Sequence, residues 1–276
     1  MTMVIVRRQG YSRDTVKELI KCIGDPNIVQ RHSGQPLPAN VTKVFYWGFR
    51  GLSYRDSITM VNNPSALTTI SNKREFRRRI SGEKYCPPTF FDFHAAYDAD
   101  QYPLVIRPNN HAGGESFYVA YDSNDLSNIW MDDHYATKLI NKASEYRVFI
   151  ANGRALCVAQ KFCRDPEEIV WNASRNSYFE NVNWDEWPLK AVKYAIEASN
   201  KTEIDFGAVD VIIDPERNVY VLEINSAPAL PQVYRRECVA KAVKYFNDNG
   251  TERIPLVDRK GGYLKFIHPC INERAY

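Results

Sequence analysis

The chain has 276 residues, which is enough for one large domain or two to three smaller ones with a sizeable core. Its formal net charge of only +3 does not call for a nucleic-acid partner. No run of 18 apolar residues occurs and the start lacks a long apolar segment, so we expect neither a membrane span nor a secretion signal, and a cytoplasmic location.

The first 64 residues predict a small α/β domain. Residues 3–8 (MVIVRR) and 41–49 (VTKVFYWGF) have the composition of short buried strands. Between them, a helix is expected from a Ser12 cap to a Gly24 stop.

The middle of the chain alternates helices and strands around one glycine-bearing loop. Residues 62–80 predict a helix with a strongly basic face. Two strands, 102–108 and 117–121, flank the loop 109–116, and a further helix is expected to begin near Asp122.

Two hairpins and a long helix are predicted in the last third. The first hairpin turns at Asn152-Gly153, the strongest short hairpin signal, and the second joins strands 207–214 and 219–225. A helix is expected over 233–250. Paired strands separated by helices indicate α+β subdomains rather than one doubly wound sheet.

The cysteines do not indicate a metal site or a disulfide framework. They are scattered, with no CxxC pair and no repeated spacing, which predicts free thiols in a reducing cytosol. The six are Cys22, Cys86, Cys157, Cys163, Cys238 and Cys270.

The loop 109–116 is the first feature with possible phosphate chemistry. Its glycines, Gly113 and Gly114, would let backbone N–H groups approach a phosphate closely. It is not a P-loop, because no GKS or GKT sequence and no helix follow it. A plain hairpin connection remains open. Arg107, just before the loop, is either a phosphate-binding cation or a solvated edge residue.

The second hairpin carries polar residues within apolar strands. Asp210 interrupts one strand, and Glu223 and Asn225 lie on one face of the other by the period of two. Burying such carboxylates costs several kcal/mol unless they are paired or bind a metal. Oxygen ligands of this kind suit Mg²⁺ held together with phosphates. The alternative is a polar outer face on a half-exposed hairpin.

The register of this hairpin decides whether the carboxylates meet. A four-residue loop, 215–218, would set Asp214 opposite Val219 and Asp210 opposite Glu223. Two like charges in directly opposed positions repel each other, and a bound cation would remove that repulsion.

The first hairpin supplies two cations, Arg147 and Lys161, which would neutralise phosphate charge or would be surface residues. An ideal two-residue turn puts them on opposite faces of the sheet. A shared site therefore requires a β-bulge or a strong twist.

Together these segments resemble the ATP-grasp superfamily, most closely the group typified by the ribosomal-protein S6 glutamate ligase and the glutathione synthetases. The likeness is most specific at DFGAVDVIIDPERNVYVLEINSAPAL, residues 205–230, where Ala229 replaces the usual Gly. In that family the corresponding segment binds two metal ions. The resemblance therefore implies that the metal ligands are Asp210, Glu223 and Asn225.

The resemblance also implies roles for residues outside the metal segment. The catalytic cations that contact phosphate or an acyl phosphate would be Arg147 and Lys161. Adenine would be held through the backbone of a hinge at residues 137–140. The residues implied to bind the nucleotide are Lys73, Arg107, Gly113, Gly114, Lys138, Leu139 and Ile140.

The implied architecture is an ATP-grasp fold in which two α+β subdomains, 65–133 and 134–276, hold ATP between them behind a small N-terminal α/β domain, 1–64. The implied activity is that of an ADP-forming carboxylate–amine ligase that works through an acyl phosphate. Its cofactors would be ATP and two Mg²⁺ ions, with Mn²⁺ as a possible substitute. Its substrates would be a small-molecule or peptide carboxylate and an amine. A fainter likeness to ATP-grasp proteins of tailed phages would place it in a host cytoplasm.

Three other functions remain open at this point. The same nucleotide site could serve a kinase or a noncatalytic ATP-binding module. A nucleic-acid-binding protein is the third, although the cations concerned spread over more than one helix face and would usually be solvated or part of a nucleotide pocket. These cations are Lys73, Arg74, Arg77, Arg78 and Arg79. The acid, the amine and the oligomeric state are not specified by the sequence.

Overall fold

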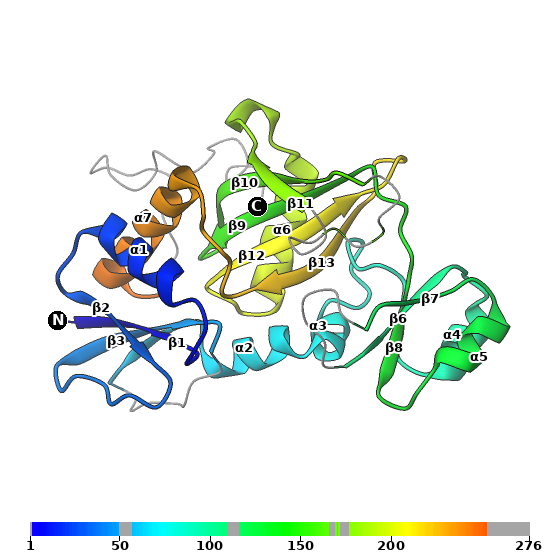
Figure 1. Cartoon of the computed structure of the whole chain (residues 1–276), viewed down its shortest axis with the longest axis horizontal. Helices are drawn as coiled ribbons and strands as arrows, with labels where there is room; N and C mark the ends of the chain where they lie inside the picture. Colours follow the sequence, from blue (N-terminus) through cyan, green and yellow to red (C-terminus); the bar gives the residue numbers. More distant parts are fainter. Residues whose placement is uncertain are drawn as a thin grey trace.

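The computed structural model describes residues 2–49, 57–109, 116–165, 169, 171 and 177–252. These residues form three sheets that follow one another along the chain (Figure 1). The two four-stranded sheets lie on either side of the central five-stranded sheet in that view, and helices α2 (Pro64–Ser71) and α3 (Lys73–Arg79) run beneath it.

The N-terminal sheet is parallel and has four strands in the order β2-β1-β3-β4. The predicted helix is confirmed as α1 (Arg13–Ile23). It ends at Gly24, which has a left-handed φ of 67° and donates its N–H to the Ile20 carbonyl. Ser12 precedes the helix but makes no side-chain cap. The strands are β1 (Thr2–Arg7), β2 (Ile28–His32), β3 (Val41–Trp47) and β4 (Thr59–Val61), of which β2 and β4 were not predicted.

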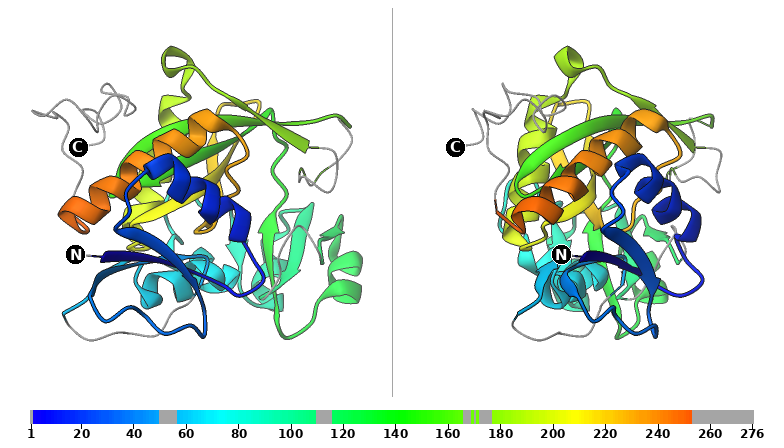
Figure 2. Two further views of the ribbon diagram at one scale, coloured as in Figure 1. Left: turned by 60° about the vertical axis from the view of Figure 1, so that its left-hand side comes forward. Right: turned by 90° about the vertical axis from the view of Figure 1, so that its left-hand side faces the viewer.

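Helix α7 (Val233–Asn249) joins the N-terminal unit to the rest of the protein. It packs beside α1, as both views in Figure 2 show. Apolar residues of β1 and α7, such as Ile5 and Val243, share one core with Phe206 of the central sheet. A boundary near residue 64 stays a prediction, because this core extends across it.

The basic segment 62–80 forms two helices, so the prediction of a single helix is wrong. Helix α2 (Pro64–Ser71) ends at Asn72, which is extended and caps helix α3 (Lys73–Arg79) by accepting a hydrogen bond from the Glu75 N–H at 3.1 Å. A side-chain oxygen that satisfies the first turn of a new helix stabilises this break.

The second sheet is antiparallel and has the strand order β5-β8-β6-β7. Helix α5 (Ser123–Ile129) begins where predicted, because the Asp122 carboxylate accepts the N–H groups of Asn124 and Asp125 at 2.9 Å. Gly113 and Gly114 lie outside the described residues. The other elements are β5 (Thr89–Phe90), α4 (Phe93–Ala99), β6 (Leu104–Pro108), β7 (Tyr118–Ala120) and β8 (His134–Lys138).

The central sheet is antiparallel, with the strand order β11-β10-β9-β12-β13. Side chains such as Val148 and Val211 face helix α6 (Leu189–Lys201) and form a hydrophobic core with it. The opposite face is covered by α7 at one end, over Phe149 and Ala208, and carries polar side chains at the other. The strands are β9 (Ser144–Ala151), β10 (Arg154–Cys163), β11 (Ser177–Asn181), β12 (Phe206–Ile213) and β13 (Val219–Asn225).

The first hairpin, β9–β10, turns at Asn152 and Gly153, whose φ angles of 44° and 68° are those that an Asn-Gly turn favours. The register shifts once between Ala155 and Cys157, so that Leu156 is an extra residue. This is the bulge that a shared site required. It places Lys161 opposite Glu145, on the same face as Arg147.

The second hairpin, β12–β13, confirms the predicted meeting of the carboxylates, although the predicted four-residue loop is wrong. The Asp214 N–H donates to the Asn218 carbonyl at 3.0 Å, which leaves a three-residue loop, 215–217. Further along, Leu222 forms a bulge that shifts the register by one residue. Because of this bulge, Asp210 still lies opposite Glu223.

Within the described part of the chain, no helix is long and apolar enough to cross a membrane. The described cysteines are free thiols, as predicted, and Cys270 lies outside the described residues.

Candidate functional site

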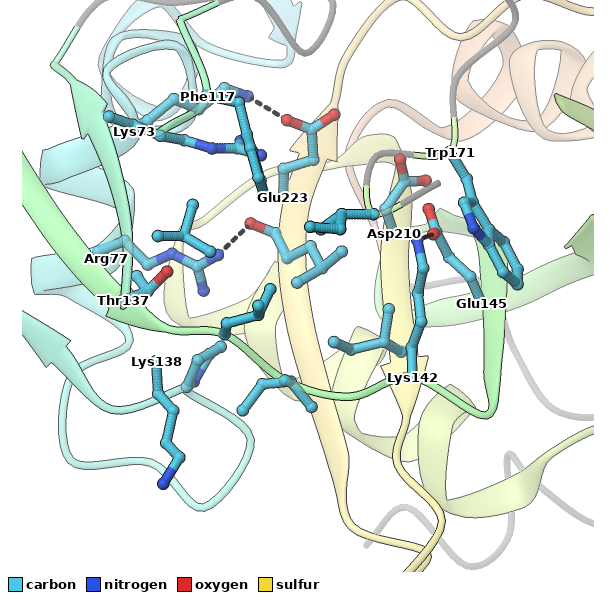
Figure 3. A pocket seen from close by; sticks show the side chains of 18 of the residues that line it. Lys73, Arg77, Phe117, Thr137, Lys138, Lys142, Glu145, Trp171, Asp210 and Glu223 are labelled. Atoms are coloured by element: carbon cyan, nitrogen blue, oxygen red, sulfur yellow. Dashed lines mark hydrogen bonds and ion pairs between the residues drawn. The ribbon is translucent and has the colours of Figure 1, made fainter. Parts of the chain in front are cut away.

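A cavity of about 340 Å³ lies between the polar end of the central sheet, α3 and the second sheet. Figure 3 shows Lys73 and Arg77 reaching into it from α3, with Glu223 at its centre and Asp210, Glu145 and Lys142 on the far side. All predicted site residues that the structure describes line this cavity. They are Lys73, Arg107, Lys138, Leu139, Ile140, Arg147, Lys161, Asp210, Glu223 and Asn225.

Three charged residues form a row across neighbouring strands of the sheet. Arg147 on β9 lies opposite Asp210 on β12, which lies opposite Glu223 on β13. The Arg147 guanidinium donates to both Asp210 oxygens, at 2.6 and 2.7 Å. Burial disfavours its charge, but the Asp210 carboxylate outweighs burial and raises the pKa of Arg147.

Glu223 is compensated from the other side of the cavity. The Lys73 ammonium lies 2.9 Å from its carboxylate and is the largest cause of a lowered Glu223 pKa; burial opposes the shift, and Arg147 and Arg107 add to it. The two opposed carboxylates therefore each have a protein cation beside them. These ion pairs offset the unfavourable free energy of burying the two carboxylates side by side. The expectation that a bound metal ion removes their repulsion is therefore corrected, because protein cations already do so.

The oxygen donors next to this row suit a hard metal ion only when other ligands complete its coordination. Asn225 follows Glu223 on the same strand face, and its side-chain oxygen accepts the Ala227 N–H at 2.9 Å, which orients the amide. Among the described residues there is no group of three or more His, Cys, Asp or Glu that could hold a metal. Two carboxylates and one amide match Mg²⁺ bound jointly with phosphates.

Glu145 is a site residue that the sequence interpretation missed. It is buried on β9 and accepts hydrogen bonds from Lys161 at 2.5 Å and from Lys142 at 3.0 Å. Burial lowers the pKa of Lys142, whose ammonium lies 4.0 Å from the centre of the Trp171 ring. The period of two could have identified Glu145, since it precedes Arg147 by two residues.

Arg77 is a second missed residue, and no local signal distinguishes it from the other arginines of the basic segment. It is buried, and its two terminal nitrogens donate to the carbonyls of Val221 and Leu222, both at 2.8 Å. These carbonyls belong to the bulge that aligns Glu223 with Asp210. Arg77 therefore ties α3 to the part of β13 that sets the register.

The predicted adenine hinge borders the cavity, but two of its N–H groups are engaged. Lys138 donates to the Pro88 carbonyl and Leu139 to the Pro103 carbonyl, both at 2.9 Å. The Lys138 side chain extends away from the acidic pair in Figure 3. If adenine binds at this hinge, its backbone partners would be Ile140 and carbonyl oxygens.

The charge of the cavity wall favours a polyanionic ligand. Its lining has seven cationic side chains and three carboxylates, an excess of four positive charges (7 − 3 = 4). Burial lowers the pKa of Arg107, which also lies 4.9 Å from the centre of the Phe117 ring. Such an excess in a recessed site attracts phosphate groups.

The remaining cations of the basic segment each contact another part of the protein. Arg74 donates to the Phe91 carbonyl, Arg78 pairs with Glu75, and Arg79 with Glu203. Each of these arginines therefore has a different partner within the protein.

Comparison with protein families gives a match to the model of the RimK-like ATP-grasp domain over residues 96–246, more than half of the chain. The match includes the row of charged residues and both hairpins, but it begins after Lys73. Comparison with curated protein sequences gives no match.

The fold is similar to that of several solved ligases. The D-alanine–D-alanine ligase from Bacillus anthracis superposes with a TM-score of 0.65 at 14% identity, covering 91% of this chain and 97% of that one. The ATP-grasp ligase PsnB, complexed with a minimal precursor, gives 0.63 at 11% identity, with 90% and 99% covered. The macrocyclase MdnC from Microcystis aeruginosa MRC, bound with precursor peptide MdnA, gives 0.60 at 14% identity, with 87% and 98% covered.

Proposed function

Because this chain belongs to the RimK-like ATP-grasp family, and is thus an ATP-dependent carboxylate–amine ligase, we propose that it activates a carboxylate as an acyl phosphate and releases ADP and phosphate. The observation that carries this proposal is the row Arg147–Asp210–Glu223 on the floor of a cavity with excess positive charge. Attack of a carboxylate on a phosphate needs positioning and charge neutralisation more than it needs a protein nucleophile.

In this proposal the metal ligands are Asp210, Glu223 and Asn225. Their oxygens are the donor type that Mg²⁺ prefers, and the nucleotide phosphates would complete the coordination of two ions. Bound there, Mg²⁺ would neutralise charge on the transferring phosphate, and Mn²⁺ could replace it. Lys73, which pairs with Glu223, would then be released to bind phosphate.

The cations around the row have separate roles. Arg147, held by both oxygens of Asp210, presents a fixed positive charge to the reacting phosphate. Lys161 is oriented in the same way by Glu145. Arg107, near the end of β6, would neutralise the phosphates from the side of the second sheet.

The substrates belong to the same proposal. PsnB and MdnC were solved with precursor peptides, so a peptide carboxylate is a candidate alongside a small-molecule acid. The amine that displaces phosphate would enter the same cavity. We place the reaction in the cytoplasm, in line with the free thiols.

The test is product analysis with a trap for the acyl phosphate. The protein is incubated with ATP, Mg²⁺, hydroxylamine and a pool of peptides and metabolite acids, and the products are identified by mass spectrometry. We expect ADP, inorganic phosphate and a hydroxamate, none of which should form with Glu223→Gln. AMP and pyrophosphate would contradict the acyl-phosphate route, and a phosphorylated alcohol would identify a kinase instead.

A further inference from the structure

Arg235, near the start of α7, is a buried cation without a carboxylate partner. Its side chain is 2% exposed, and its hydrogen bond runs from one terminal nitrogen to the Phe179 carbonyl at 3.3 Å. Its Nε is buried and has no hydrogen-bond partner. The ion pairs among the described residues include none for Arg235. Burying an arginine in this way is unfavourable unless an anion joins it.

The neighbouring Arg236 shows what a satisfied arginine on the same helix looks like. It donates to the carbonyls of Leu230 and Pro231 and lies 3.6 Å from the Glu18 carboxylate. These contacts explain Arg236 as a structural residue. Arg235 has no comparable set of partners.

Arg235 adjoins the basic wall of the cavity. Three guanidinium or ammonium groups surround the partly buried Phe179 ring: Arg147 at 4.7 Å, Lys161 at 5.6 Å and Arg235 at 5.7 Å from its centre. Arg147 and Lys161 each have a carboxylate within the protein, in Asp210 and Glu145. Arg235 is therefore the cation of this group whose charge is left for a ligand.

The position of Arg235 relative to the central sheet indicates which ligand it would bind. From the predicted hinge at residues 137–140, the strand face of β9 presents Glu145, then Arg147, then Phe149 beneath α7. A nucleotide with its base at the hinge extends its phosphates toward Arg147. Arg235 lies to one side of them, toward β11, because its partner Phe179 stands on β11 opposite Lys161; from there it can meet a second anionic group held beside the phosphates.

We propose that Arg235 binds a carboxylate group of the acid substrate and positions it beside the nucleotide, with the Phe179 ring moving aside to admit it. This inference rests on the proposed function for the identity of its neighbour, the nucleotide. The guanidinium fork matches two carboxylate oxygens, which is the interaction that the unpartnered Nε lacks.

The test compares Arg235→Met with Arg236→Met, using glutarate as the probe and sodium chloride of equal ionic strength as the reference. Binding is measured by titration calorimetry in the presence of ADP and Mg²⁺, and thermal unfolding is followed without ligand. We expect Arg235→Met to bind glutarate roughly 10- to 100-fold more weakly, since it loses hydrogen bonds to a charged group. Its affinity for ADP should stay unchanged, and Arg236→Met should bind glutarate as the wild type does.

The unfolding temperature separates a binding role from a structural one. Removing an uncompensated buried charge should leave Arg235→Met at least as stable as the wild type. A lower unfolding temperature with unchanged glutarate affinity would make Arg235 structural and overturn the proposal. Loss of ADP affinity rather than glutarate affinity would assign Arg235 to the nucleotide and also overturn it.

Two further outcomes bear on the proposed function and on the role of Arg235 separately. Failure of the wild-type protein to bind ADP with Mg²⁺ would count against the proposed function, whatever Arg235 does. Should Arg235→Met not fold, Arg235→Lys decides the question, because it keeps the charge and loses the fork: weakened glutarate binding with unchanged ADP binding supports the proposal, and unchanged glutarate binding overturns it.

Discussion

Replacing Arg77 by methionine should damage both stability and metal binding, because one side chain fixes the bulge in β13. Arg77 donates two hydrogen bonds of 2.8 Å to the carbonyls of Val221 and Leu222. Methionine keeps most of the apolar stem and removes the donors. The register shift at Leu222 is what places Glu223 opposite Asp210.

The magnitude follows from the number and burial of these bonds. A hydrogen bond from a charged donor contributes about 1.5–3 kcal/mol, so losing two should lower the free energy of unfolding by about 3–6 kcal/mol. Arg78→Met is the matched control on the same helix. Its partner is Glu75 in a half-exposed pair, so its loss should change the free energy of unfolding by no more than about 0.5 kcal/mol.

The assay pairs urea unfolding with ADP-forming turnover at increasing Mg²⁺. Misplacing a reactive group by about 1 Å can lower a rate by about 100-fold, and we expect Arg77→Met to lose turnover on this scale and to need more Mg²⁺. Arg78→Met should resemble the wild type. The reasoning is refuted if Arg77→Met unfolds at the urea concentration of Arg78→Met and keeps the wild-type Mg²⁺ dependence.

Other variants test other parts of the site. Arg147→Ala and Lys161→Ala should each lower ADP formation roughly 100- to 1,000-fold without unfolding the protein; unchanged rates in both would make them surface cations. Asp210→Asn and Glu223→Gln should abolish Mg²⁺-dependent turnover, and persistence of turnover at wild-type Mg²⁺ concentrations would exclude these residues as ligands. Burial raises the pKa of Asp205 from 3.8 to about 6, so the folded state binds the proton more tightly and the free energy of unfolding falls as pH rises between these values. Asp205→Asn should therefore gain about 3 kcal/mol relative to the wild type at pH 7 but not at pH 3; an equal difference at both pH values in urea unfolding would contradict this.

Local signals in the sequence were enough to predict the elements that carry their own turn or cap chemistry. The Asn152-Gly153 hairpin and the start of α5 at Asp122 are confirmed because the deciding residues lie next to the element they define. The break at Asn72 was missed, since the same side chain that caps α3 also fits within a continuous polar helix face. Short strands such as β4 and β5 depend on their sheet partners and have no pattern of their own.

The proposed metal ligands of the second hairpin were predictable as a set of residue types, but their geometry was not. The prediction had a four-residue loop and no bulge, whereas the structure has a three-residue loop and a bulge at Leu222. Both arrangements bring Asp210 opposite Glu223. A bulge depends on contacts such as those from Arg77, which lies 144 residues away from Val221 in the sequence. Single-sequence periodicity contains no information about such a partner.

The charge compensation of the site depends on distant contacts in the same way. Lys73 was predicted to contact ATP, and its pairing with Glu223 joins α3 to β13. Glu145 could have been predicted, because it precedes Arg147 by two residues and so lies on the same strand face. Its partner Lys142 lies in the connection before β9, where no sequence pattern identifies it. The domain boundaries and the likeness to phage proteins stay predictions.

A crystal structure of the protein with ADP and Mg²⁺ tests the central claim most directly. We predict metal density between the carboxylates of Asp210 and Glu223, within reach of the Asn225 oxygen, with ADP phosphates completing the coordination and Lys73 no longer paired with Glu223. Nucleotide bound elsewhere, or a metal that leaves the Lys73–Glu223 pair intact and contacts neither carboxylate, would contradict the account.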